Sequence, residues 1–102
     1  MKKNIVDLIK ESYEIGLAQV YSEIFSFVTY LEFNKFNGDF IEIWTSKGGN
    51  FNLLSSFVDK DKIKISIDLP NGIHGGINVF DGIERDDRIK DKFENVYLIR
   101  DD

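Results

Sequence analysis

Apolar side chains recur at helical spacing near the start of the chain. They follow one another at intervals of three and four and define one face of a helix: Ile5, Leu8, Ile9, Tyr13, Leu17, Val20, Tyr21 and Ile24. Asn4 is suited to cap the first turn, because its side-chain oxygen can accept a hydrogen bond from a free backbone amide. Asp7 adds a negative charge where the helix dipole favours one. The pattern predicts an amphipathic helix that ends near residue 23.

The segment that follows favours a β-hairpin. Residues 25–36 are rich in aromatic and β-branched side chains, which are typical of strands. Asn37-Gly38 comes next and is the strongest two-residue signal for a hairpin turn. We therefore expect a hairpin made of residues 27–36 and 39–45. A single helix that continues to about residue 33 is the competing interpretation.

The clearest strand pattern covers residues 62–68. Isoleucines alternate there with polar side chains: Ile63, Ile65 and Ile67 against Lys62, Lys64, Ser66 and Asp68. Such alternation predicts one buried face and one face in water, so we expect the isoleucines in the core. Leu69-Pro70-Asn71-Gly72 predicts a turn, and residues 75–80 a partner strand.

The remaining segments are more ambiguous. Residues 51–58 form an apolar cluster that fits a short strand or a helical turn. Residues 81–92 alternate in charge and fit a loop or an edge helix, and residues 93–99 predict a final strand. One helix followed by about five strands, mostly joined by short turns, predicts an α+β fold. We expect the N-terminal amphipathic helix to pack on a mainly antiparallel sheet.

Length and composition indicate a single domain. A chain of 102 residues can bury about 65% of its surface, which suits one core, and no linker or repeat divides it. We therefore expect one α+β domain over residues 1–102. No run approaches the roughly eighteen apolar residues that span a bilayer, and no signal peptide is recognisable. We expect a cytoplasmic protein.

The acidic residues are concentrated near the C-terminus. The net charge of −5 argues against a general binder of nucleic acid or of acidic membranes. Residues 81–102 hold eight acids and five bases, against ten acids and eight bases in residues 1–80. A negative edge would attract a basic partner, and its candidate contacts are Glu84, Asp86, Asp87 and Asp91. Local ion pairs such as Glu84–Arg88 are the alternative interpretation.

An apolar anchor for such a partner is available in the second strand of the expected hairpin. Phe40, Glu42 and Trp44 share one face of this strand. If its other face is the core, Trp44 lies on the surface, where tryptophan is a preferred anchor of interfaces. The alternative is that Trp44 belongs to the core. Asp39 and Tyr97 join Glu42 and Trp44 as candidate partner contacts.

Catalytic chemistry has one candidate residue. His74 lies among glycines and titrates near neutrality, so it could act as a general acid or base. No second acid, base or nucleophile stands at a matching spacing, and no P-loop is present. One histidine and no cysteine leave only carboxylates for a metal. We expect no catalytic residue, cofactor or metal. A small enzyme that uses His74 on a phosphoester or RNA is the alternative function.

A small, acidic, cysteine-free α+β chain without a catalytic set resembles the immunity proteins of bacterial toxin systems. Contact-dependent growth inhibition and other polymorphic toxins are the closest type, and the acidic residues 81–94 and the isoleucine-rich residues 62–68 carry the resemblance. It implies tight binding to the C-terminal nuclease domain of a cognate toxin, at its active site or at an exosite. We expect this toxin domain to be basic, and we expect no direct contact with nucleic acid or membrane. An anti-restriction or anti-CRISPR inhibitor is a third interpretation. The oligomeric state stays open.

Overall fold

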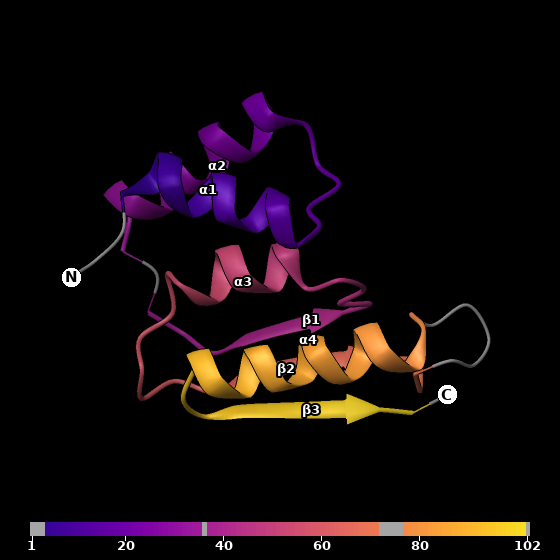
Figure 1. The fold of residues 1–102 in the computed structure, drawn as a ribbon. Coiled ribbons are helices and arrows are strands. Elements are labelled where there is room, and N and C mark those ends of the chain that lie inside the picture. The colour runs from indigo at the N-terminus through magenta and orange to yellow at the C-terminus, as the bar shows by residue number, and fades with distance from the viewer. Residues whose placement is uncertain (1–3, 36, 72–76, 102) are drawn as a thin grey trace.

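A computed structural model of the protein describes residues 4–35, 37–71 and 77–101. Within them it has four helices and three strands, in this order: α1 (Ile5–Ile15), α2 (Tyr21–Phe33), β1 (Phe40–Ile43), α3 (Gly49–Ser55), β2 (Lys64–Asp68), α4 (Val79–Lys92) and β3 (Val96–Arg100). In Figure 1, α1 and α2 form an upper layer, α3 lies beneath them, and the sheet and α4 form the lower part.

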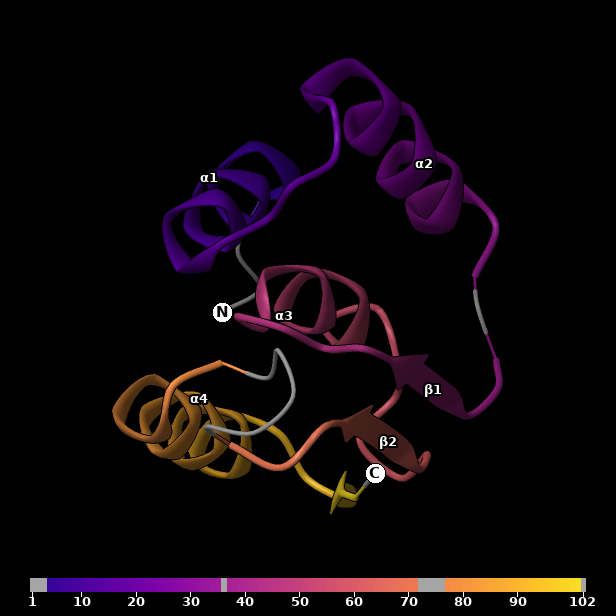
Figure 2. The same ribbon diagram turned by 90° about the vertical axis from the view of Figure 1, so that its right-hand side faces the viewer.

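The three strands form a parallel sheet in the order β1-β2-β3. α3 connects β1 to β2, and α4 connects β2 to β3. Because both connections step across the sheet in the same direction, right-handed crossovers place both helices on the same face. Figure 2 shows α3 and α4 on one side of the strands, while no described helix lies against the other side.

The expected antiparallel sheet of about five strands is therefore wrong. The strand expected at residues 27–36 is not formed in the described residues 27–35, because α2 extends from Tyr21 to Phe33. β1 has no hairpin partner and pairs in parallel with β2 instead. The aromatic and β-branched side chains of α2 are compatible with a helix because Ile24 and Val28 are buried in the core, and this packing outweighs a weak strand preference.

The N-terminal helix does not pack on the sheet, as the sequence suggested, but on α2 and α3. Asn4 caps it as expected, accepting a hydrogen bond from the backbone N–H of Asp7 at 2.9 Å. The helix ends at Ile15 because Gly16 adopts a φ of 133°, which glycine tolerates best. The expected helix to about residue 23 and the competing single helix to about residue 33 are both wrong, because residues 16–20 separate α1 from α2. The competing interpretation is right only in that residues 27–33 are helical.

Two of the remaining expected strands are present, and two ambiguous segments are helical. The strands expected at residues 62–68 and 93–99 are confirmed as β2 and β3, and the apolar residues 51–58 and the charged residues 81–92 are helical, in α3 and α4. Val79 and Phe80, at the end of the strand expected at residues 75–80, are helical instead, because α4 begins at Val79. Residues 72–76 lie outside the described part of the chain.

The apolar core lies between the helices rather than on the sheet. It consists of Leu8, Ile9, Leu17, Ile24, Val28 and Leu53. Phe51 connects this core to the sheet layer, with its ring centroid 5.6 Å from that of Phe40 and 6.2 Å from that of Phe93. α3 therefore packs against the N-terminal helices on one side and the strands on the other.

The central strand turns its polar side inward. Lys64, Ser66 and Asp68 are 2%, 0% and 8% exposed, whereas Ile65 and Ile67 are only partly buried on the opposite face. The expectation that the isoleucine face is buried is therefore wrong. Polar groups can be buried at little cost when they are hydrogen-bonded, and Lys64 Nζ donates to three backbone carbonyl oxygens at 2.9–3.3 Å.

No helix in the described ranges is long and apolar enough to cross a membrane.

Candidate partner-binding surface

α4 carries most of the acidic residues that the sequence singled out, and its start is well defined. The Asn78 side chain accepts a hydrogen bond from the backbone N–H of Asp81 at 2.9 Å and donates one to the Asp81 carboxylate at 2.7 Å. Asp81 in the first turn and Lys90 and Lys92 in the last turn complement the helix dipole. Because the cap sets the first residue of the helix, it also sets which side chains point inward.

The inward side of α4 is built around Arg85, which is 1% exposed. Its Nη1 donates to the Asp68 carboxylate at 3.1 Å and to the Ser46 carbonyl at 2.6 Å, and its Nη2 donates to the Asn71 side-chain oxygen at 3.1 Å. Asp68 is the last residue of β2, and Ser46 follows β1. These bonds therefore join α4 to the carboxyl end of the sheet. A buried guanidinium with this many acceptors holds the helix in one orientation.

Asp86 also turns toward the sheet. One of its carboxylate oxygens accepts from Arg85 Nε at 2.9 Å and from Arg100 Nη2 at 2.8 Å. Burial alone would raise the pKa of Asp86, but the hydrogen bonds from Arg100 and Arg85 outweigh it and hold that pKa below the usual range. Asp86 was a predicted partner contact, and the structure commits its carboxylate to internal ion pairs.

Two further cations of α4 contact the rest of the fold. Arg88 Nη2 donates to the Lys47 carbonyl at 2.7 Å. Lys92 Nζ contacts the Glu11 carboxylate at 2.8 Å and the Asn52 side-chain oxygen at 2.6 Å. Three of the four cations of α4, namely Arg85, Arg88 and Lys92, are thus bonded to other elements of the fold.

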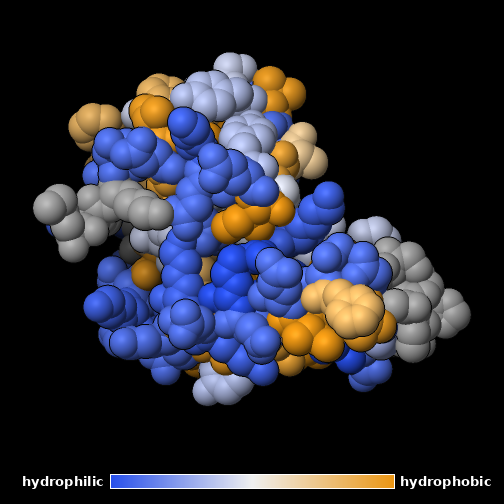
Figure 3. Space-filling model, in the orientation of Figure 1, coloured by the Kyte–Doolittle hydropathy of each residue, from blue (hydrophilic) through white to orange (hydrophobic). Residues whose placement is uncertain are grey.

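The carboxylates of Glu84, Asp87 and Asp91 remain on the outward side of α4. All three residues are exposed and, within the described part of the chain, make no ion pair, so the expected Glu84–Arg88 pair is not formed. Helical spacing places them beside Phe80 and Ile83, which are 84% and 51% exposed. We call these five residues the outer α4 face. In Figure 3, apolar side chains gather over the start of α4 and hydrophilic ones over the rest.

The outer α4 face contains a small electrostatic conflict. Glu84 and Asp87 are three residues apart and Asp87 and Asp91 four apart, so like charges are neighbours on the helix surface. Each such pair destabilises a helix by about 0.2–0.5 kcal/mol. A cationic partner would relieve this repulsion, which makes the face more favourable in a complex than alone.

The other predicted contacts lie elsewhere. The Asp39 carboxylate accepts from the Ile63 backbone N–H at 2.8 Å, next to the start of the sheet. Trp44 is 73% exposed, so it is not a core residue, and its φ of 69° ends the alternation of β1. Tyr97 is 56% exposed on the face of the sheet that α3 and α4 leave uncovered. These residues do not form one surface with α4.

Glu42 lies on the helix-covered face of β1. Its Oε2 accepts from Asn50 Nδ2 at 2.5 Å, and its Oε1 is buried without a hydrogen-bond partner in the described structure. Burial, with a smaller contribution from the Asp68 carboxylate, raises the pKa of Glu42, although hydrogen bonds from Asn50 and Thr45 oppose this. A carboxyl group with a raised pKa can hold a proton and act as a general acid or base. The nearby Ser66 hydroxyl could serve it as a nucleophile only if a substrate reached it, and this hydroxyl is fully buried.

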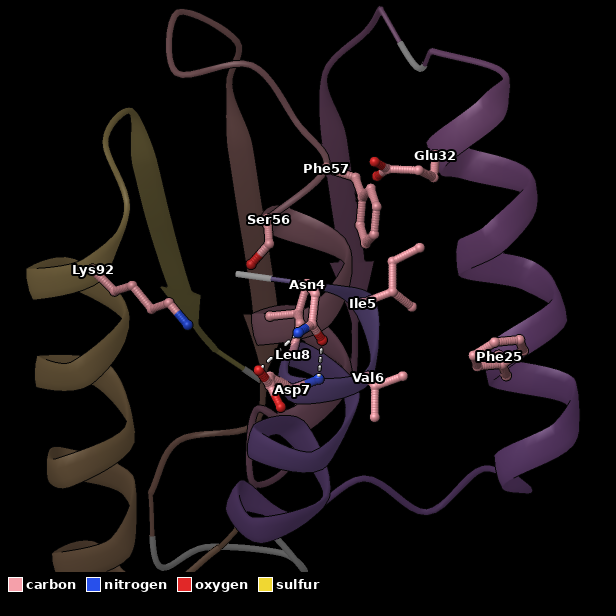
Figure 4. A pocket seen from close by; sticks show the side chains of 10 residues that line it. All are labelled: Asn4, Ile5, Val6, Asp7, Leu8, Phe25, Glu32, Ser56, Phe57 and Lys92. Carbon is pink, nitrogen blue, oxygen red and sulfur yellow. Dashed lines mark hydrogen bonds between the residues drawn. The ribbon is translucent and has the colours of Figure 1, made fainter. Parts of the chain in front are cut away.

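A groove of about 770 Å³ lies on another side of the molecule, between the start of α1 and α2. Figure 4 shows Ile5 and Val6 from α1 opposite Phe25 from α2, with Phe57 beside Glu32. Most polar side chains of the groove are engaged in the fold: Asp7 bonds to Asn4, the Ser56 hydroxyl donates to the Asn52 carbonyl, and Lys92 bonds to Glu11 and Asn52. No residue of the outer α4 face contributes to it.

The structure offers no metal centre in the described ranges, where no three carboxylate or histidine side chains meet. His74, the candidate general acid or base, lies outside the described residues. Comparisons of this chain with protein-family models, with curated proteins and with solved structures find no match. Function therefore has to be inferred from the residues of this chain, and the outer α4 face is the best-defined candidate.

Phe80 and Ile83 are site residues that reasoning from the sequence missed. Phe80 was expected to end a strand, and Ile83 lies in residues 81–92, which were expected to form a loop or an edge helix. The signal that could have found them is an apolar pair three residues apart among exposed acids, because this spacing puts both side chains on the same side of a helix as Glu84 and Asp87.

Proposed function

We propose that this chain is a cytoplasmic protein that binds a basic protein through the outer α4 face and thereby neutralises it. The class that fits best is the immunity protein of a bacterial toxin system, with the C-terminal nuclease domain of a toxin as partner. The observation that carries the proposal is the sorting of charges on α4. Arg85, Arg88 and Lys92 bond to other elements, while Glu84 and Asp87 stay exposed on the helix surface.

A nuclease is a suitable partner because its substrate surface must attract phosphate groups and is therefore cationic. Carboxylates of Glu84, Asp87 and Asp91 on one rigid helix offer the opposite charge over about two turns. Complementary charge of this kind accelerates association and fixes the relative orientation of the partners. Phe80 and Ile83 add exposed apolar area, which supplies affinity once water is excluded.

The outer α4 face is also preorganised. Asn78 caps the helix, Arg85 anchors it to the carboxyl end of the sheet, and Asp86 joins it to Arg100 of β3. A surface that is already ordered loses little conformational entropy on binding. These internal contacts therefore support the proposal although they do not themselves face the partner.

The test uses the C-terminal domain encoded directly upstream of this chain's gene, purified in a catalytically inactive form. The variant replaces Glu84, Asp87 and Asp91 by lysine. The association rate, measured by stopped-flow fluorescence, should fall at least about tenfold at low salt, and the difference should shrink at high salt because ions screen the interaction.

The matched control replaces Glu14, Glu32 and Asp61 by lysine, three exposed acids outside α4, and changes the net charge by the same amount. Its association rate should change much less than that of the α4 variant. Equal losses in both variants would show that only net charge matters and would contradict recognition by α4. Failure of the unaltered chain to bind the upstream domain would contradict the assignment to a toxin system.

A further inference from the structure

The sheet has one face that no described element covers. The strands present six apolar side chains on it and no charge: Ile41, Ile43, Ile65, Ile67, Tyr97 and Ile99. We call these residues the free sheet face. Ile43 and Ile41 are 67% and 56% exposed, and Tyr97 and Ile99 are 56% and 44% exposed. In Figure 2, α3 and α4 both lie on the opposite side of the strands.

The strand register makes this face continuous. Ile41, Ile65 and Tyr97 are paired across the three strands, and so are Ile43, Ile67 and Ile99, which gives two rows of three side chains. Together they expose on the order of 500 Å² of apolar surface, whereas a monomer rarely shows a contiguous apolar patch above a few hundred Å². Parallel sheets are almost always covered on both faces. A second layer is therefore expected here.

Charge decides which kind of layer fits. The free sheet face carries no carboxylate that could pair with a basic toxin domain. It therefore does not suit the partner proposed for α4. Two copies of this chain, each with a net charge of −5, repel one another overall, so an uncharged face is the most favourable place for them to meet. The exposed aromatic side chains of α2 are a poorer choice, because Glu23 and Glu32 lie among them.

We propose that two copies of this chain pair through their free sheet faces and form a two-fold symmetric dimer. In such a dimer the same patch must match itself, and two flat, uncharged rows of isoleucine satisfy this condition. Pairing two faces would remove on the order of 1,000 Å² of surface from water, which reaches the lower size limit of a specific interface. The sheets would stack about 10 Å apart, as in a β-sandwich.

The dimer leaves the proposed toxin surface accessible. α4 packs on the other side of the sheet through Arg85, so Glu84 and Asp87 point away from the dimer interface. The dimer does not depend on the proposed function, and the two can fail separately. A monomeric protein that still binds its toxin through α4 would refute the dimer alone.

Sedimentation velocity of the purified chain tests the dimer at concentrations up to about 100 μM. We expect a species of twice the chain mass of 11.8 kDa. The variant Ile43→Lys should raise the dimer Kd at least about 100-fold, because dimerisation would then bury unpaired charges. The matched control is Ile83→Lys on the outer α4 face, which has a similarly exposed isoleucine and should remain dimeric.

Tyr97→Lys on the opposite edge strand provides a second variant, and circular dichroism shows which variants retain the fold. A dimer lost in either folded variant and kept in Ile83→Lys supports the proposal. A monomeric wild-type chain over the whole concentration range overturns it. So does a dimer that persists in folded Ile43→Lys and Tyr97→Lys, since its interface would then lie elsewhere.

Discussion

Glu42 is a carboxyl group in an environment that disfavours its charge. Burial raises its pKa above the value of 4.5 that it has when exposed, so between the two values the folded state binds more protons than the unfolded state. The contribution of Glu42 to stability is therefore fully present below its unfolded pKa and is lost as the pH rises through its folded pKa. Near neutrality, Glu42 destabilises the fold.

This predicts the effect of Glu42→Gln. The amide is neutral at every pH and keeps an oxygen for the hydrogen bond from Asn50, so the free energy of unfolding should be higher than that of wild type at about pH 7. The advantage should vanish near pH 4, where wild-type Glu42 is protonated as well. Urea denaturation at both pH values measures it. Glu14→Gln, at an exposed position, is the control, and its free energy of unfolding should stay close to that of wild type.

Single residues were predictable from the sequence where their role is local. Asn4 was expected as a helix cap and is one, because a cap involves only the next few backbone amides. Asp86 could not be assigned in the same way, since its partner Arg100 lies fourteen residues away, on strand β3. Nothing in the sequence near Asp86 distinguishes it from Asp87, which faces outward.

At the scale of elements, α4 shows how one small residue permits a close contact. Gly82 is buried inside the helix, and a Cβ added there would overlap the side-chain amide of Asn71. That amide accepts a hydrogen bond from Arg85, so it cannot move away without leaving a buried guanidinium short of an acceptor. Gly82 therefore lets α4 approach the end of β2.

Gly82→Ala separates this contact from helix propensity. In the wild-type background it should destabilise the protein by about 1–3 kcal/mol, because the overlap with Asn71 disturbs the bond to Arg85. In an Asn71→Ala background the space is open, and the same substitution should stabilise by about 1 kcal/mol through helix propensity. Chemical denaturation of the four proteins measures both effects. An equal change in both backgrounds would contradict the proposed contact.

Elements were predicted well where their periodicity is strong and poorly where it is not. The alternation in residues 62–68 marks β2, and the helical spacing of the first residues marks α1. The segment of α2 carries residues that fit a strand as well as a helix, and only the burial of Ile24 and Val28 against α1 and α3 decides for the helix. Strand direction depends on such decisions, because a helix in this place leaves β1 without a hairpin partner.

At the scale of the whole molecule, the sheet separates two surfaces of different character. The outer α4 face is acidic with an apolar start, and the free sheet face is uncharged and apolar. They lie on opposite sides of the strands, since α4 packs on the covered face. The two proposed partners, a second copy and a basic protein, would therefore bind on opposite sides of the sheet.

This arrangement predicts a complex of two chains with two toxin domains. Sedimentation of the purified complex should give that stoichiometry, and Ile43→Lys should reduce it to one chain with one domain without changing the association rate at low salt. The two sites would then be independent, as expected for surfaces without shared residues. A 2:1 complex would contradict the prediction, because it would mean that the dimer obstructs one α4 face.

The sequence by itself determined a capped amphipathic helix at the N-terminus, two of the strands, the lack of cysteine and the acidic C-terminal region. Only the tertiary structure decided which side of each element is inside. The alternation in β2 shows that the strand has an apolar and a polar face, but it does not show which of the two is buried. The polar face is the buried one, and Lys64 can lie there because the carbonyl groups of Asp59 and Glu94 accept its hydrogen bonds. The sequence likewise gives only the summed charge near the C-terminus. The fold divides this charge, because Arg85, Arg88 and Lys92 bond to other elements while the carboxylates of Glu84, Asp87 and Asp91 stay exposed.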